Sequence, residues 1–289
     1  MARRRRRSAG CLAVVLVVAV GAAALVWLPG IVQRHGYKLE AQSCTATYGD
    51  YVDYKTAEQA GNAAIISAVG LSYGFDTWGV TVAIATAIQE SSLRNLDYGD
   101  RDSLGLFQQR PSQGWGEPEQ VRDPHYASSK FYQALDQVPG WRDMPLTEAA
   151  QAVQRSGFPD AYADHEREAR AWAEALTGGA GVVECHVPDG VIGTPQAFAE
   201  RLHHDFGSGR FAVEVADVDK DRTTLRITPL VGDESANHAV REWAVATAAS
   251  TGVVEASGWG HRWVNGVGRS TLEEGEDGPE PVTVVIATR

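Results

Sequence analysis

The sequence has few basic residues, few cysteines and few long apolar runs. It contains 289 residues, of which 26 are Lys or Arg and 37 are Asp or Glu, so its formal charge is -11. Five arginines and no acid lie in residues 1–30, which leaves 21 basic and 37 acidic residues and a charge of -16 beyond them. Because nucleic-acid binding depends on surface cations, we expect no nucleic-acid partner.

Only one apolar run is long enough to cross a bilayer. Residues 11–28 contain no charge and follow the basic block Arg3–Arg7. This pattern predicts a cytoplasmic tail over 1–10, a transmembrane signal-anchor over 11–28 and a linker over 29–43. The chain is then a single-pass protein of the cell membrane with its bulk on the extracytoplasmic side. A signal peptide cleaved near Ala22–Ala24 is the alternative.

Motifs for nucleotides, metals and serine hydrolysis are absent or incomplete. Gly207-Ser208-Gly209 lacks the Lys and the spacing of a phosphate-binding loop. His203-His204-Asp205 lies on a predicted helix, where adjacent side chains point in different directions, so we expect no metal and no cofactor. Gly70–Gly74 matches the nucleophile elbow of serine hydrolases, but a helical pattern precedes it where the elbow requires a strand.

The most informative segment is a predicted helix over 77–91. Val80, Ile84 and Ile88 recur at i, i+4 and i+8, and Glu90 projects beside them from an alanine-lined edge in the last turn. Partial burial and the negative end of the helix dipole both favour the protonated carboxyl, as a general acid requires. An exposed glutamate that merely ends a helix is the alternative.

A glycine turn with paired amides follows this helix. Gly105-Leu106-Phe107-Gln108 comes fourteen residues after Glu90-Ser91, at the offset where a known family has Gly-Leu-Met-Gln. With the runs 95–103 and 111–116, these residues are similar to the lysozyme-like lytic transglycosylases, and more closely to a membrane-anchored actinobacterial branch of that family. The resemblance covers about residues 44–185.

The resemblance implies a mainly α lysozyme-like domain over 44–177 with Glu90 as the sole catalytic carboxylate. Glu90 would protonate the oxygen between N-acetylmuramic acid and N-acetylglucosamine in peptidoglycan glycan strands. It would then accept the proton of the 6-hydroxyl as a 1,6-anhydro ring closes. On the same resemblance Ser91, Gly105 and Gln108 shape the cleft, and Ser103 is a further substrate-binding candidate.

Two alternatives concern the residues around this acid. Asp97, Asp100 and Asp102 could supply a second carboxylate, so lysozyme-type hydrolysis stays open, although such a loop is more often a solvated turn. Trp115, between Gly114 and Gly116, suits stacking on a sugar ring, or it could cover the core.

The sequence departs from the family in the helix that closes the groove. The family has Ala-Tyr-Asn there, whereas residues 149–157 contain Val153-Gln154. Gln154 could replace the asparagine amide, and Tyr162 could supply the missing hydroxyl. Tyr162 also begins an apolar stripe that predicts core packing for its ring; the stripe continues with His165, Ala169, Trp172 and Leu176.

The three cysteines permit one disulfide. Cys44 and Cys185 bracket the region of resemblance and no cysteine interrupts it, so we expect them to be bonded in an oxidising compartment. Cys11 is left as a small apolar residue of the predicted membrane segment.

After a predicted linker over 178–192, the pattern of apolar residues changes over residues 193–289. A helix begins at Thr194-Pro195, and alternating segments follow it, so we expect a small α+β sandwich domain. Trp259, His261 and Trp263 could form an exposed strip for a protein partner, although a packed face is more usual. This domain leaves open a second function, a catalytically weak glycan-binding scaffold of a cell-wall or secretion machine.

Overall fold

The computed structural model describes residues 43–231, 234–271 and 281–288. The predicted cytoplasmic tail and membrane segment lie outside them. Within the described residues, no helix combines the length and the hydropathy needed to cross a membrane. The stretch Gln42–Arg289 forms one compact unit.

The first part of this unit is built from helices whose ends follow local signals. Helix α3 (Thr77–Ser91) is capped by Asp76, whose carboxylate accepts a hydrogen bond from Gly79 N at 3.0 Å. Helix α5 (Pro124–Asp136) begins behind Asp123, which caps two backbone N–H groups. The other elements are α2 (Ala57–Ser72), η1 (Pro111–Gln113), α4 (Pro118–Val121), η2 (Trp141–Asp143), α6 (Leu146–Gln154), η3 (Pro159–His165) and α7 (Glu166–Leu176).

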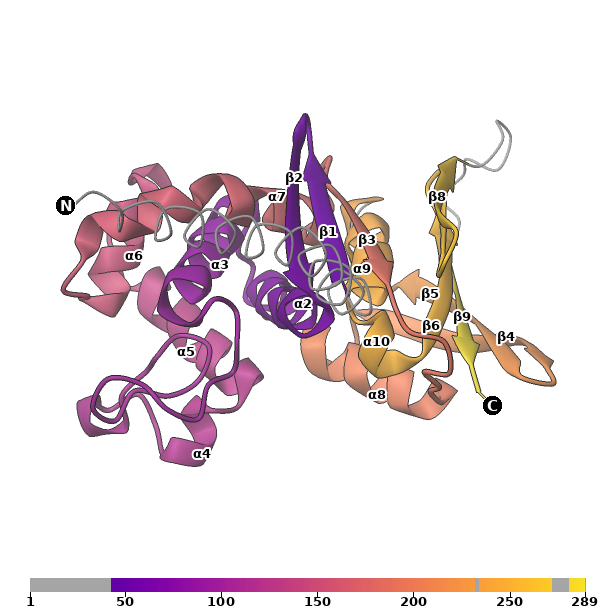
Figure 1. Ribbon diagram of the computed structural model, residues 1–289, viewed down its shortest axis with the longest axis horizontal. Coiled ribbons are helices and arrows are strands. Elements are labelled where there is room, and N and C mark those ends of the chain that lie inside the picture. Colours follow the sequence, from indigo (N-terminus) through magenta and orange to yellow (C-terminus); the bar gives the residue numbers. More distant parts are fainter. Residues whose placement is uncertain (1–42, 232–233, 272–280, 289) are drawn as a thin grey trace, which may run out of the picture. The chain divides into compact units, whose positions relative to one another are not determined.

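A three-stranded antiparallel sheet closes this part of the chain (Figure 1). Strands β1 (Ser43–Tyr48) and β2 (Tyr51–Thr56) form a hairpin, and β3 (Val182–His186) pairs with the other edge of β1. Cys44 and Cys185 are direct partners in that pairing and form the expected disulfide, with 4.0 Å between their Cα atoms. β3 lies within the stretch that was expected to be a linker.

The second part is a six-stranded antiparallel sheet in the order β4-β5-β9-β6-β7-β8. Its buried side chains, among them Leu225, Val284 and Ile286, pack with Phe198 and Trp243 of the neighbouring helices. The helices are α8 (Pro195–Phe206), α9 (Glu234–Ala246) and α10 (Ala248–Thr251), and the strands are β4 (Phe211–Asp219), β5 (Arg222–Pro229), β6 (Val253–Gly258), β7 (His261–Val264), β8 (Gly268–Thr271) and β9 (Val282–Ala287).

The expected fold class is therefore wrong. We expected a mainly helical domain followed by a small sandwich, but the structure has 46% helix and 24% strand, with antiparallel sheets of three and six strands. The first sheet escaped detection because β1 needs β3, more than 130 residues away, as a partner. The apolar side chains of the second sheet pack with those of the helices in one hydrophobic core, so they do not form the separate small sandwich that the sequence predicts. Helix α6 begins at Leu146 behind Pro145 and not at Thr147, the capping residue that the sequence predicts.

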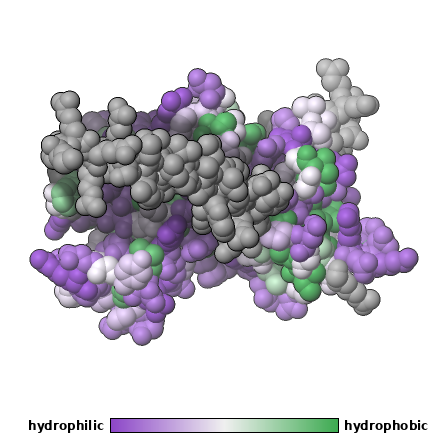
Figure 2. Space-filling view, viewed as in Figure 1, coloured by the Kyte–Doolittle hydropathy of each residue, from purple (hydrophilic) through white to green (hydrophobic). Residues whose placement is uncertain are grey.

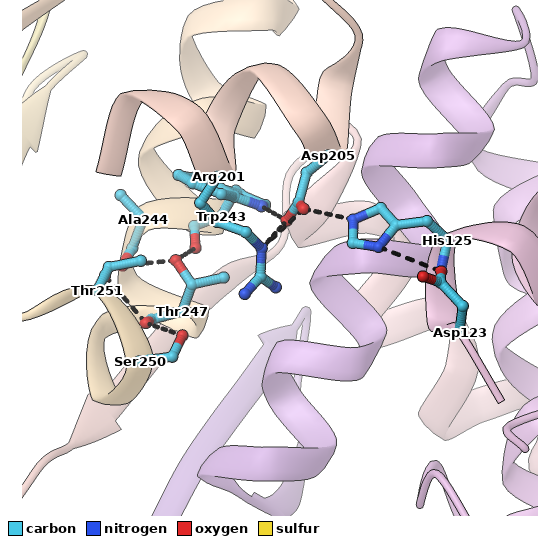
Figure 3. Close-up of polar contacts among 9 residues, drawn as sticks. All are labelled: Asp123, His125, Arg201, Asp205, Trp243, Ala244, Thr247, Ser250 and Thr251. Carbon is cyan, nitrogen blue, oxygen red and sulfur yellow. Dashed lines mark hydrogen bonds and ion pairs between the residues drawn. The ribbon is translucent and has the colours of Figure 1, made fainter. Parts of the chain in front are cut away.

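A buried polar cluster joins α5 to α8 and α9 (Figure 3). The fully buried Asp205 carboxylate accepts hydrogen bonds from His125 at 2.6 Å, from Arg201 at 2.7 and 2.9 Å, and from Trp243 at 2.8 Å. Trp259, His261 and Trp263 do not form a fully exposed strip, because Trp263 is buried, as a packed face requires. The face shown in Figure 2 is mainly hydrophilic, with small hydrophobic groups.

Candidate active site

Glu90 lies in the last turn of α3, next to the end of the helix at Ser91. Val80 and Ile84 are fully buried and Ile88 nearly so, so the apolar stripe predicted from the sequence faces the core. The Glu90 side chain emerges at the edge of this stripe and is half-buried. The chain then turns away through Ser92, which adopts a left-handed conformation with φ of 54°.

Tyr162 of η3 contacts this carboxyl group directly. Its hydroxyl donates a hydrogen bond to Glu90 Oε1 at 2.7 Å, while its ring is fully buried. Core packing and a polar role, which the sequence analysis had treated as alternatives, therefore coexist in one side chain. Tyr162 thus places a phenol hydroxyl beside Glu90.

Burial raises the pKa of Glu90 above its ordinary value of 4.5, although hydrogen bonds from Tyr162 and Gln154 stabilise the ionised form and offset part of the effect. Burial and the negative charge of Glu90 also raise the pKa of the Tyr162 hydroxyl, which therefore remains a donor at neutral pH. The pair combines a carboxyl that resists ionisation with a fixed neutral donor.

Helix α6 brings Gln154 to the same site. Val153 is buried beside it, and Gln154 Nε2 donates a hydrogen bond to the Phe107 carbonyl at 2.7 Å. This bond joins α6 to the turn formed by residues 104–109, which is closed by mutual hydrogen bonds between Leu104 and Gln109. Gln154 thus connects the 104–109 turn to the surroundings of Glu90.

Ser91 fixes the same turn from the other side. Its hydroxyl is buried and lies 2.7 Å from the Leu106 carbonyl and 3.0 Å from the Ala87 carbonyl of its own helix. The hydroxyl is therefore engaged within the protein. This geometry favours a role for Ser91 in shaping the site.

Gly105 and Gln108 adopt backbone conformations that form this turn. Gly105 has φ of 76°, and a Cβ atom there would lie 2.1 Å from the Val121 carbonyl oxygen, so only glycine fits. Gln108 has φ of 46°, and its amide lies 3.2 Å from the Gly105 carbonyl and 3.3 Å from the Tyr98 carbonyl. Ser103 is buried, and Trp115 is half-buried and packs in part against the core.

The neighbouring aspartates differ in their surroundings. Asp102 accepts hydrogen bonds from Arg110 Nε at 2.9 Å and from Ser112 N at 2.8 Å, one on each oxygen. Hydrogen bonds from Ser112 and Arg110 hold the pKa of this carboxyl well below its usual range. Asp97 and Asp100 are exposed. Asp102 is therefore a weak base whose two oxygens already have partners.

Sequence analysis missed a chain of polar contacts behind the site. His165 Nε2 lies 2.8 Å from Gln89 Oε1, and its Nδ1 lies 2.6 Å from Glu168 Oε1. Lys55 of β2 contacts Glu168 and Asp53 at 2.7 Å each. His165 appeared only as a member of the apolar stripe. Its position three residues after Tyr162 is the sequence signal that could have identified it.

Among the described residues, His125, His204 and Asp205 could be considered as metal ligands, because their ligand atoms lie within 4.8 Å of one another. However, both oxygens of the Asp205 carboxylate already accept hydrogen bonds, including two from the Arg201 guanidinium, which compensates the negative charge. A carboxylate offers about four lone-pair sites, and these contacts, with the one from His125, occupy them. This cluster is better interpreted as a structural junction.

Comparisons with known proteins do not place this chain. No family model matches it, and no curated protein matches it significantly.

Proposed function

We propose that this chain is an extracytoplasmic enzyme that cleaves the β-1,4 bond between N-acetylmuramic acid and N-acetylglucosamine in peptidoglycan. Glu90 acts as the single acid and base, and the products carry 1,6-anhydro rings. One observation carries the proposal: a half-buried glutamate with a raised pKa ends a buried helix, and a buried tyrosine hydroxyl donates to it at 2.7 Å.

The contact with Tyr162 suits both halves of the reaction. Because the hydroxyl donates to Oε1, the proton of the neutral acid is directed to Oε2, from which it can pass to the glycosidic oxygen. After this transfer, hydrogen bonds from Tyr162 and Gln154 stabilise the carboxylate. Glu90 can then accept the proton of the sugar 6-hydroxyl as C1 of the muramic acid ring bonds to that oxygen.

The surroundings of Asp102 favour this route over hydrolysis. A hydrolase with two carboxyl groups needs a second one that acts as base or nucleophile. Asp102 is already bound through both oxygens to Arg110 and Ser112. An intramolecular attack by the sugar itself needs no second carboxylate.

The location of the enzyme is part of the proposal. Residues 11–28 anchor it in the cell membrane, and the disulfide between Cys44 and Cys185 supports an oxidising, extracytoplasmic compartment. Peptidoglycan glycan strands are the substrate in that compartment.

The test is mass spectrometry of purified peptidoglycan after incubation with the full chain in detergent, beside Glu90→Gln. We expect anhydro-muropeptides from the wild type alone. Reducing-end products would mean hydrolysis and would overturn the single-carboxylate mechanism. A folded wild-type protein that sediments with peptidoglycan but releases no fragment would overturn the enzyme and leave a glycan-binding scaffold.

A further inference from the structure

His165 connects the candidate acid to the hairpin of the first sheet. It ends η3, a 3-10 helix in which side chains three residues apart lie one above the other. Tyr162 and His165 therefore face α3 together, and they contact the adjacent residues Glu90 and Gln89. A change at His165 is thus positioned to move Tyr162 relative to Glu90.

Both ring nitrogens of His165 face oxygen atoms. Nδ1 lies 2.6 Å from Glu168 Oε1, and Nε2 lies 2.8 Å from Gln89 Oε1. The ring therefore bridges α3 and α7, with each of its nitrogens within hydrogen-bond distance of a side-chain oxygen.

The contacts of Glu168 continue this bridge to β2. Glu168 of α7 faces Nδ1, and it also accepts a hydrogen bond from Lys55 of β2 at 2.7 Å. Lys55 in turn contacts Asp53, which accepts a hydrogen bond from Trp172 at 2.7 Å. His165 is therefore connected through Glu168 and Lys55 to the hairpin of β1 and β2.

Burial would raise the pKa of Glu168, but hydrogen bonds from His165 and Lys55 outweigh this effect and lower it to about 2. Glu168 is therefore ionised at neutral pH and provides a permanent acceptor for Nδ1. Its side chain is 18% exposed, so solvent screens the pair only in part.

We propose that His165 is a positioning residue: through its contacts with Gln89 and Glu168, it holds η3 against α3 and keeps the Tyr162 hydroxyl on Glu90. The consequence for activity rests on the proposed function of Glu90. Loss of the His165 side chain loosens the Tyr162 contact, so the reaction slows.

The first test needs no activity. The full chain, labelled with ¹³C at the glutamate carboxyl groups, is titrated by NMR beside His165→Gln, and Glu90→Gln identifies the Glu90 signal. In His165→Gln we expect a further rise in the pKa of Glu90, because its carboxylate loses the fixed donor. A control variant, His186→Gln, removes an exposed histidine of β3 and should leave Glu90 unchanged.

The second test is kinetic. Loss of a hydrogen bond to a charged group is worth a rate change of about tenfold, so His165→Gln should lower kcat about tenfold with little change in KM. His165→Arg, whose guanidinium can donate to both Gln89 and Glu168, should recover part of kcat.

An unchanged Glu90 titration in His165→Gln would overturn the proposal. The two proposals can fail separately. If the NMR results hold but the wild type releases no muropeptides, the enzyme assignment fails and the positioning of Tyr162 by His165 stands.

Discussion

Two buried glutamates of this chain have opposite surroundings. Glu90 of α3 is hydrogen-bonded by the neutral side chains Tyr162 and Gln154, and its pKa is raised. Glu242 of α9 is fully buried, but it accepts hydrogen bonds from the guanidinium groups of Arg241 and Arg269 at 2.6 and 2.7 Å. Burial would raise the pKa of Glu242, but its hydrogen bonds and the two cations outweigh that and lower it to about 2.

The difference shows that the charge of the partners decides what a buried carboxyl can do. Glu242 also accepts a hydrogen bond from Val183 N at 2.6 Å, so it joins β3 to α9 as a permanent anion. Glu90 has no cation among the groups that shift its pKa. A carboxyl with neutral donors can hold a proton and release it, whereas one between two guanidinium groups serves structure alone.

The largest expected effect is the loss of catalysis in Glu90→Gln. Removal of a general acid lowers kcat about 10²- to 10⁴-fold, because the leaving oxygen then departs without a proton. Release of muropeptides measures the rate, and circular dichroism checks the fold. Retention of most of the activity would contradict the role of Glu90.

Glu242→Gln should instead damage stability. The variant leaves Arg241 and Arg269 buried with less compensation, and loss of one partner of a buried ion pair costs about 3–5 kcal/mol. Chemical denaturation would measure the free energy of unfolding. Activity per folded molecule should be unchanged, and a selective loss of activity without destabilisation would refute the contrast with Glu90.

Acid should separate the two kinds of carboxyl group. The pKa values of Glu242 and Glu168 fall to about 2 from an ordinary 4.5. Their stabilising contributions are therefore present above pH 4.5 and are lost as the pH falls toward 2. Glu90 has a raised pKa, so its ionisation affects stability in the opposite direction. The stability that it contributes is present below pH 4.5 and is lost as the pH rises through the pKa of the folded state. Thermal unfolding from neutral to acidic pH should show Glu90→Gln gaining stability relative to wild type only at the neutral end.

The smallest expected effect comes from Tyr162→Phe. The ring stays buried, but Glu90 loses a hydroxyl donor, so its pKa should rise further and kcat should fall about tenfold. The pH dependence of kcat tests this prediction. An alkaline limb that moves to lower pH would mean that the hydroxyl does not stabilise the Glu90 carboxylate.

Much of the helical framework could be predicted from local signals. Asp76, Thr194 and the proline after Asp123 are local signals of this kind, and α3, α8 and α5 begin at them. The apolar stripe before Glu90 placed this carboxyl at the edge of a buried helix face. These features could be predicted because each depends on residues within a few positions of one another.

The rest depends on contacts between distant segments. Strand β1 is short and needs β3 as a partner, and the pairing carries no local signal beyond the cysteines themselves. His125 reaches Asp205 across 80 positions, and Glu168 reaches Lys55 across 113. From the sequence, core packing and a role in the site are alternatives for Tyr162. The spacing of apolar residues predicts where its ring packs, but it does not predict where its hydroxyl lies.

The most direct measurement is a ¹³C NMR titration of the Glu90 and Glu242 carboxyl groups in one sample of the full chain, with each signal identified by its Gln variant. The account predicts that Glu90 titrates above 4.5 and that Glu242 titrates near 2. A Glu90 carboxyl that titrates at or below 4.5 would contradict its role as a general acid.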